Sequence, residues 1–474
     1  MENSLVYELA EFAHATKISD MPSEVIEESK RILLDSIGCA FSGISHKRGR
    51  IGADFAGVMG GKGATILATG QRASAFGAAF ANAEAINALD FDVVLPPGHV
   101  SPYVLPPALA TAEEKKSSGD ELIIAIAVAH EMSNRIGKAM DYHRDIKDGQ
   151  VVPPKVWGFA STVLGGAAAT ARLRGMDKGS IAHAISIAAM ISPVNSASAW
   201  REHANPTTIK YALGGWFSQT ALTAAHLAEL GHRGDMQIFD PEYGYPKFIG
   251  TSRWSPESVT KDLGKKWNFP QDETFKHYPH CRVLAAPLDA LTFLIKKHNI
   301  APEEIDKIEA LVEGFLDRPL WSNRNIVDET DGQFSVAHGL ATGAHGFVPG
   351  AAWQDPVNVF SPSVLELMGK VTYSAHPDYI TALERDPHAR PTRVTVHARG
   401  QIFTEDRTHP RGTSDPERYG YFTTPDLIDK FLINSANVMS DRNAIDLSQM
   451  IMNISDIDDI NDLTNFIAKS VSVA

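Results

Sequence analysis

The stretch Leu-Ile-Ile-Ala-Ile-Ala-Val-Ala, residues 122–129, decides the fold class of this chain. It is apolar on every face of a helix, and a helix of that kind is buried on all sides. It is also far shorter than the roughly 20 residues that a membrane-spanning helix needs. The stretch therefore predicts the buried central helix of a bundle, in a protein that does not enter a membrane.

The sequence on both sides of this stretch also predicts helices. Residues 158–171 and 181–190 are rich in small residues, which permit close helix approach, and we interpret both segments as core packing. Near the N-terminus, apolar residues keep a helical spacing from Val25 to Ile37, and Pro22 lies near the expected start of that helix. We therefore expect a series of helices up to about Gly231.

The apolar periodicity changes after about residue 262. Residues 307–313 and 393–405 alternate between apolar and polar side chains, as strands do, and Gly400 marks a hairpin turn. Further helices are expected at about 281–298, 360–370, 424–435 and 444–470. The predicted fold class is mainly α with an α+β part.

The length of 474 residues predicts more than one domain, because a single core stops growing well below that size. The helices expected at the end of the chain most simply rejoin the first bundle. We therefore predict a large all-helical domain formed by both chain ends and a smaller inserted α+β domain. The predicted boundaries are 1–262 and 409–474 for the helical domain and 263–408 for the smaller one.

Composition excludes several classes of function. The 57 acidic and 44 basic residues give a net charge of −13 without a long run of either sign, which argues against nucleic acid as a partner. The first apolar segment is interrupted by Glu8 and Glu11 and has no features of a signal peptide, so we expect a cytoplasmic protein. Cys39 and Cys281 are too few for a disulfide framework or an iron–sulfur cluster.

Asp90, Asp92 and His99 lie in a segment that cannot remain helical. Pro96 and Pro97 disfavour a helix, and shaped loops on helical scaffolds often carry catalytic groups. The spacing matches no metal-binding signature, so acid–base chemistry is the functional interpretation. A structural role, in which an aspartate caps a turn and His99 fills a polar surface, is equally compatible with the spacing.

Two further segments combine cations with expected helix starts. Pro206 and the threonines after it predict a helix with Lys210 in its first turns, where a lysine is either solvated or directed at an anion. The segment 275–282 places several basic side chains before a helix expected near Val283. Such a helix start is suited to binding a carboxylate. The basic residues and the tyrosine of that segment are Lys276, His277, Tyr278, His280 and Arg282.

His338 lies at the start of an expected apolar helix, as either a core histidine or a proton-transfer group. The sequence has no dinucleotide-binding glycine motif after a strand, no P-loop, no Gly-x-Ser-x-Gly and no His-Glu-x-x-His. Nucleotide-binding, serine-hydrolase and zinc-protease functions therefore have no support.

Taken in order, these stretches resemble the MmgE/PrpD family over nearly the whole chain. Six short motifs carry the resemblance: Leu89-Asp-Phe-Asp with His99 downstream, Glu131-Met-Ser-Asn-Arg-Ile, Ile209-Lys-Tyr with Gly215, Lys-x-Tyr-Pro-x-Cys at 276–281, Gln333-Phe-Ser-Val, and His409-Pro-Arg-Gly. The resemblance implies the two-domain arrangement above, a homodimer, and an active site between the domains without a metal or organic cofactor. It places Asp90, His99 and Lys210 on active-site positions and Lys276 on a position facing substrate carboxylates.

The resemblance implies a cofactor-independent lyase, a dehydratase or decarboxylase acting on a small di- or tricarboxylate of the 2-methylcitrate or aconitate type. The expected catalytic residues are Asp90, His99, Lys210 and His338, and the expected substrate-binding residues are Lys276, His277, Tyr278 and Arg282. Two positions depart from decarboxylase-like members, with Val152 in place of a histidine and His338 in place of a tyrosine. An epimerase of a dicarboxylate such as iminodisuccinate and a non-catalytic polycarboxylate-binding protein therefore remain alternatives.

Overall fold

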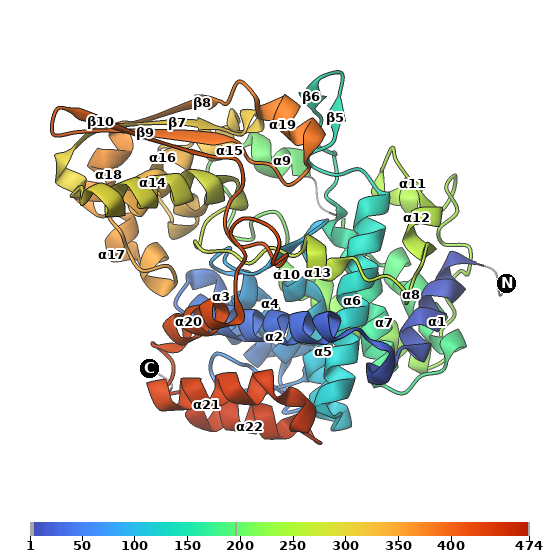
Figure 1. The fold of residues 1–474 in the computed structure, drawn as a ribbon. Helices are drawn as coiled ribbons and strands as arrows, with labels where there is room; N and C mark the ends of the chain where they lie inside the picture. Colours follow the sequence, from blue (N-terminus) through green and yellow to red (C-terminus); the bar gives the residue numbers. More distant parts are fainter. Residues whose placement is uncertain (1–3, 195–196, 473–474) are drawn as a thin grey trace.

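A computed structural model describes residues 4–194 and 197–472 of the chain. Its first half consists of helices that pack side by side, below and to the right of the sheet in Figure 1. The longer helices of this part are α1 (Leu5–Ala15), α2 (Ser23–Gly43), α3 (Lys47–Met59), α4 (Ala75–Asn87), α5 (Ser101–Lys115), α6 (Gly119–Ala139), α7 (Thr162–Leu173), α8 (Lys178–Met190) and α10 (Gly214–Glu229). Shorter ones are α9 (Ala197–Glu202), α11 (Tyr245–Ile249), α12 (Pro256–Thr260) and α13 (Phe269–Asp272).

Helix α6 is the buried helix that the stretch 122–129 predicts. Residues 122–129 are at most 5% exposed, and α6 contacts α1, α2, α5, α7 and α12. Ser118 and Glu121 form a capping box that begins the helix. Small residues on α7 allow close approach, because a Cβ added at Gly165 would lie 2.5 Å from the carbonyl oxygen of Ala129. The prediction of a central helix surrounded by small-residue helices is confirmed.

The second part of the chain forms a four-stranded sheet in the order β10-β9-β7-β8. Its strands are β7 (Ile305–Val312), β8 (Val371–Ala375), β9 (Thr392–Ala398) and β10 (Gln401–Arg407). Strand β7 is parallel to β8 and antiparallel to β9, and β9 and β10 form the predicted hairpin, with Gly400 at positive φ in its turn. Strands β7 and β9 bury alternate residues, as expected for a sheet covered on one face.

Helices cover the inner face of this sheet. α14 (Ala285–His298) contacts β9 and β10, and α16 (Val336–Ala344) contacts α14, β8 and α18 (Pro362–Gly369). Figure 1 shows these helices beneath the strands. The remaining short helices are α15 (Pro319–Ser322), α17 (Pro356–Val359) and α19 (Tyr379–Arg385). The molecule is mainly α with some β structure, as predicted.

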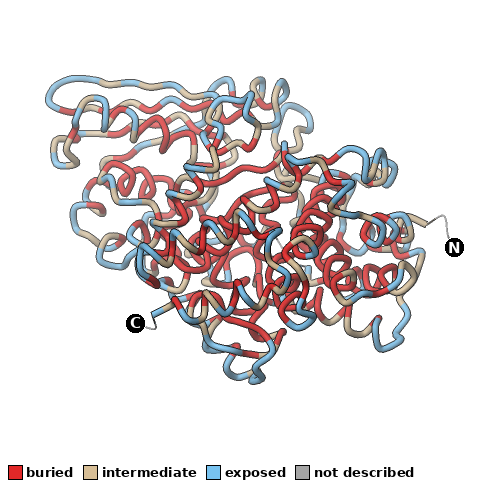
Figure 2. Tube along the Cα trace, turned by 60° about the horizontal axis from the view of Figure 1, so that its bottom comes forward, coloured by how far each residue is buried: buried red, intermediate tan, exposed pale blue. Residues whose placement is uncertain are grey.

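The last part of the chain returns to the first helices. α20 (Thr424–Ser435) and α21 (Asp441–Met452) both pack against α2, and α22 (Asn461–Ser470) packs against α21. Figure 1 shows these red helices beside the blue ones. In Figure 2 the buried residues gather in the middle of the helical part, and the exposed ones lie at its rim. The exact domain boundaries remain a prediction.

One expected helix is absent. Residues 208–211 form a turn, and the next helix, α10, begins only at Gly214. Lys210 therefore does not lie in the first turns of a helix, and its backbone has a positive φ of 54°. The helix expected at 281 begins with a 3₁₀ turn, Arg282–Leu284, before α14. Among the described residues, every helix is too short or too polar to cross a membrane.

Candidate active site

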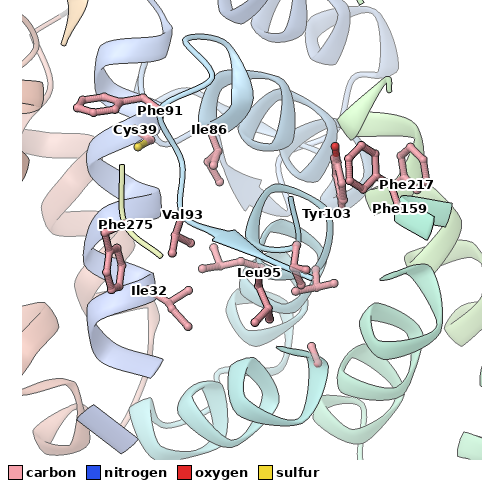
Figure 3. Close-up of a cluster of buried hydrophobic side chains, with 14 of the residues drawn as sticks. Ile32, Cys39, Ile86, Phe91, Val93, Leu95, Tyr103, Phe159, Phe217 and Phe275 are labelled. Atoms are coloured by element: carbon pink, nitrogen blue, oxygen red, sulfur yellow. The ribbon is translucent and has the colours of Figure 1, made fainter. Parts of the chain in front are cut away.

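The segment after α4 leaves the helix and forms a short hairpin. Its strands are β3 (Val94–Leu95) and β4 (Gly98–His99). Figure 3 shows Phe91, Val93 and Leu95 of this segment among buried hydrophobic side chains. Asp90 and Asp92 instead contact polar partners, Lys276 and His99 respectively. In the sequence Asp-Phe-Asp-Val, the two apolar side chains therefore anchor the loop in the core, and the two carboxylates make polar contacts.

His99 pairs with Asp92. Its Nδ1 lies 2.6 Å from Asp92 Oδ2, and its ring stacks on Tyr211 with centroids 5.1 Å apart. The carboxylate acts as the acceptor for an Nδ1–H, which leaves Nε2 with its lone pair. Nε2 lies 3.5 Å from Asp90 Oδ1. The short contact that orients the imidazole is therefore made by Asp92.

Asp90 is a buried carboxylate between two lysines. Lys276 Nζ lies 2.6 Å from Asp90 Oδ2, and Lys210 Nζ lies 3.5 Å from Asp90 Oδ1. The Tyr211 hydroxyl donates to the same Oδ1 at 2.8 Å. Burial alone would raise the pKa of Asp90, but the neighbouring cations, Lys276 foremost, hold it well below its usual range. Asp90 is therefore ionised at neutral pH.

Lys210 is fully enclosed and carries a perturbed amine. Its Nζ donates to the Asn87 carbonyl at 2.5 Å. Burial lowers its pKa from 10.5 to about 7, although Asp90 favours the charged form. Asp90 and Lys210 both have positive φ, 53° and 54°, a backbone region that costs non-glycine residues energy. A titrating lysine in a strained turn beside an Asp–His pair marks this cluster as a functional site.

A pocket lies in front of this cluster, where the helical part meets the sheet-containing part. His99, Asp90 and Tyr211 line it from the helical side, and Arg282 and Arg390 line it from the other. Its remaining wall is largely aromatic, with Trp157, Phe159, Trp200, Phe315 and Trp321. Lys210 and Lys276 adjoin the pocket through Asp90.

Three of the expected site residues lie elsewhere. His277 packs edge-on against the Phe422 ring, and the Tyr278 hydroxyl contacts Asp289 at 3.1 Å. His338 lies within α16, and its Nε2 is 2.9 Å from the Val359 carbonyl. The side chains of His277, Tyr278 and His338 do not line the pocket between the two parts of the described chain. These side chains take part in packing and internal hydrogen bonds.

We expect His338 to contribute to stability rather than to turnover. His338→Leu should lower the melting temperature, because the unpaired Val359 carbonyl costs about 1–3 kcal/mol. His338→Gln can donate again to that carbonyl and should recover part of the loss. Both folded variants should keep wild-type kcat, measured alongside thermal unfolding. A folded His338→Gln enzyme with greatly reduced kcat would contradict this assignment.

Two residues that connect the site were not singled out from the sequence. Asn87 Nδ2 lies 2.9 Å from Asp92 Oδ1 and 3.3 Å from His99 Nδ1, and it donates to the Tyr211 hydroxyl at 3.1 Å. Tyr211 follows Lys210 directly, and its place in Ile-Lys-Tyr was the available signal. Asn87 ends α4 and carried no signal of its own.

A buried ion pair supports the backbone of the loop that carries Asp90 and Asp92. Lys430 Nζ lies 2.7 Å from Asp35 Oδ1 and donates to the Phe91 carbonyl at 2.8 Å. Asp35 Oδ2 accepts from the Val93 amide at 3.1 Å. The pair joins α2 to α20 and fixes the backbone on both sides of Asp92. Side chains far apart in the sequence thus set the orientation of the Asp92–His99 pair.

Within the described part of the chain, no three histidine, cysteine, aspartate or glutamate side chains are grouped so as to hold a metal ion. The groups that the site offers are an imidazole oriented by a carboxylate, a second carboxylate between two amines, and guanidinium groups across the pocket. Groups of this kind are suited to proton transfer on an anionic ligand.

Comparisons with known proteins agree with this interpretation. A family model described as the MmgE/PrpD N-terminal domain matches residues 7–256, and one described as the MmgE/PrpD C-terminal domain matches residues 278–454. The chain belongs to the MmgE/PrpD family, and it is an enzyme of the lyase type. It is 26% identical to cis-aconitate decarboxylase of Homo sapiens, over 98% of this chain and 95% of the relative. It is 24% identical to cis-aconitate decarboxylase of Aspergillus terreus, with the same coverage.

Proposed function

We propose that the protein is a cofactor-independent lyase that removes water or carbon dioxide from a small di- or tricarboxylate. The observation that carries the proposal is the Asp92–His99 pair, with a 2.6 Å contact at Nδ1, because it leaves Nε2 as the proton-transfer atom at the pocket. The cis-aconitate decarboxylases among its relatives support a substrate of this kind.

The surrounding charges suit such a reaction. In dehydration, Nε2 takes a proton from the carbon beside a carboxylate, the C–O bond on the neighbouring carbon breaks, and the protonated imidazole gives that proton to the departing hydroxide, which leaves as water. In decarboxylation, the C–C bond to the departing carbon dioxide breaks, and an imidazole that starts the reaction protonated at Nε2 gives its proton to the carbon left behind. Negative charge develops next to the carboxylate in both cases and needs fixed positive charge nearby. Lys210 and Lys276 lie against Asp90, and the guanidinium groups of Arg282 and Arg390 line the pocket, so cations are available on both sides of a bound carboxylate.

Incubation with 2-methylcitrate, citrate and cis-aconitate tests the proposal directly. Turnover is followed by alkene absorbance and by release of carbon dioxide, and we expect one of these acids, or a close carboxylate analogue, to react. Exchange of a substrate C–H with heavy water without net product would identify an epimerase instead. Tight binding with neither exchange nor turnover would identify a binding protein. The homodimer and the cytoplasmic location remain predictions.

A further inference from the structure

The pocket contains a second group of cations, separate from the two lysines beside Asp90. Arg282 and Arg390 line it, and Arg144 stands behind them as the partner of Glu313. Arg390 lies just before β9 and Glu313 just after β7, so adjacent strand ends bring these two together. His143, next to Arg144 in the chain, also lines the pocket.

Among the described residues, this group carries more positive than negative charge. Three guanidinium groups surround one ionised carboxylate, that of Glu313, whose pKa the arginines hold below its usual range against the effect of burial. Burial raises the pKa of the other buried carboxyl near Arg282, that of Glu273, well above its usual range, which favours its uncharged form. Burial and the charges of Arg390 and Arg144 lower the pKa of Arg282 to about 9. Buried charge without a partner is costly, so the arrangement favours an anion.

Several donors of this group are also unused. Among the described residues, the Nε atoms of Arg282 and Arg390 and the Nδ1 atom of His143 are buried without a hydrogen-bond partner. Arg390 is only 4% exposed, so water does not readily replace the missing acceptor. Buried polar atoms in native proteins are nearly always paired, and guanidinium groups pair best with carboxylates.

Aromatic rings connect this group to the reacting end of the pocket. The His143 ring stacks on Trp157 at 5.3 Å, and Trp157 is parallel to Tyr211 at 6.1 Å. Tyr211 in turn stacks on His99. A ligand that reaches from His99 to His143 therefore passes along two aromatic rings.

We propose that Arg282, Arg390 and His143 form a second carboxylate subsite of this pocket, and that the substrate joins its two carboxylates through an apolar segment lying against Trp157 and Tyr211. This inference rests on the proposed function, because it describes the far end of the same substrate. It predicts a dicarboxylate with an apolar middle in preference to a monocarboxylate of equal length.

Binding calorimetry with paired acids tests the subsite without requiring turnover. The probes are succinate, glutarate, adipate, pimelate and suberate, each compared with the straight-chain monocarboxylate of the same length. At the matching length, the dicarboxylate should bind roughly 10- to 100-fold more tightly, the range for charge-assisted hydrogen bonds. In Arg282→Gln that preference should disappear, and in Arg282→Lys it should be intermediate, because the amine keeps the charge without the planar fork.

Arg282 is a better residue to replace than Arg390. The Nη2 of Arg282 donates to a neutral hydroxyl, that of Thr274, at 2.9 Å, whereas Arg390 forms an ion pair with Glu313 that its replacement would break. Replacing a poorly balanced cation should leave the melting temperature unchanged or raise it. Arg442→Gln, on the exposed side of α21, is the matched control and should keep the full preference. An Arg282→Gln protein of normal stability that retains the preference would overturn the subsite, as would a wild-type protein without any preference at any length.

The two proposals can fail separately. A protein that binds dicarboxylates through Arg282 but turns over no carboxylate would keep the subsite and refute the lyase reaction. A protein that turns over a carboxylate equally well with and without Arg282, and shows no dicarboxylate preference, would keep the lyase and refute the subsite.

Discussion

His99→Gln should lower kcat by about 10²- to 10⁴-fold, the range for loss of a general acid–base group, while the protein remains folded. The imidazole is the titratable side chain that Asp92 orients with Nε2 toward Asp90 at the pocket. Glutamine retains hydrogen bonding at this position but cannot carry the proton. Steady-state kinetics with the best carboxylate found, together with thermal unfolding, measures the effect.

His397→Gln provides the control for this substitution. His397 lies on β9, where its Nε2 is 2.7 Å from Glu309, far from the pocket in the sequence and on a different element. The same exchange there should leave kcat unchanged. Normal turnover in a folded His99→Gln enzyme would show that the loop is structural and that the proton moves through another group.

Lys210→Ala should lower kcat/KM by about 10²- to 10³-fold, comparable to removal of one preorganised donor at a site of developing charge. The buried amine helps to balance Asp90, and its loss leaves that carboxylate undercompensated next to His99. Lys210→Arg should recover activity only in part, because a planar fork replaces a point charge. Near-wild-type kcat/KM in Lys210→Ala would remove the lysine from the proposed mechanism.

The pH dependence adds a sharper test of Lys210. Its pKa of about 7 means that the amine is charged below neutrality and loses its charge as the pH rises. If that charge favours binding of the anionic substrate, kcat/KM should fall as the pH increases through 7. This decrease should be absent in Lys210→Arg, because guanidinium keeps its charge. An identical profile in both enzymes would assign the decrease to another group.

The sequence predicted the helical and sheet-containing parts well, because hydrophobic periodicity is a local signal. Residues 122–129 and the alternating segments at 307–313 and 393–405 each carry their own pattern, and each lies in the expected element. The prediction of a helix directly after Pro206 was wrong, because it rested on residues that favour a helix start and not on an apolar periodicity. Tertiary contacts of Lys210 with Asp90 and Asn87 hold a turn instead.

The site was only partly predictable from the sequence. Asp90, His99, Lys210 and Lys276 meet as expected, because the loop signal and the resemblance pointed to the same positions. His277 and Tyr278 follow Lys276 in the chain but turn away from the pocket, since neighbouring residues in an irregular segment share no common direction. Arg390 reaches the pocket from beside the sheet, a contact between distant segments that no local pattern reveals.

The buried ion pair of Asp35 and Lys430 has a consequence for folding during synthesis. Asp35 lies on α2 and is synthesised long before Lys430, which belongs to α20. Until α20 has been made and has docked on α2, the Phe91 carbonyl lacks its ammonium donor and Asp35 lacks its counter-ion. A nascent chain can therefore assemble much of its core while the loop from Asp90 to His99 still lacks this support. We therefore expect activity to require α20, the helix that carries Lys430.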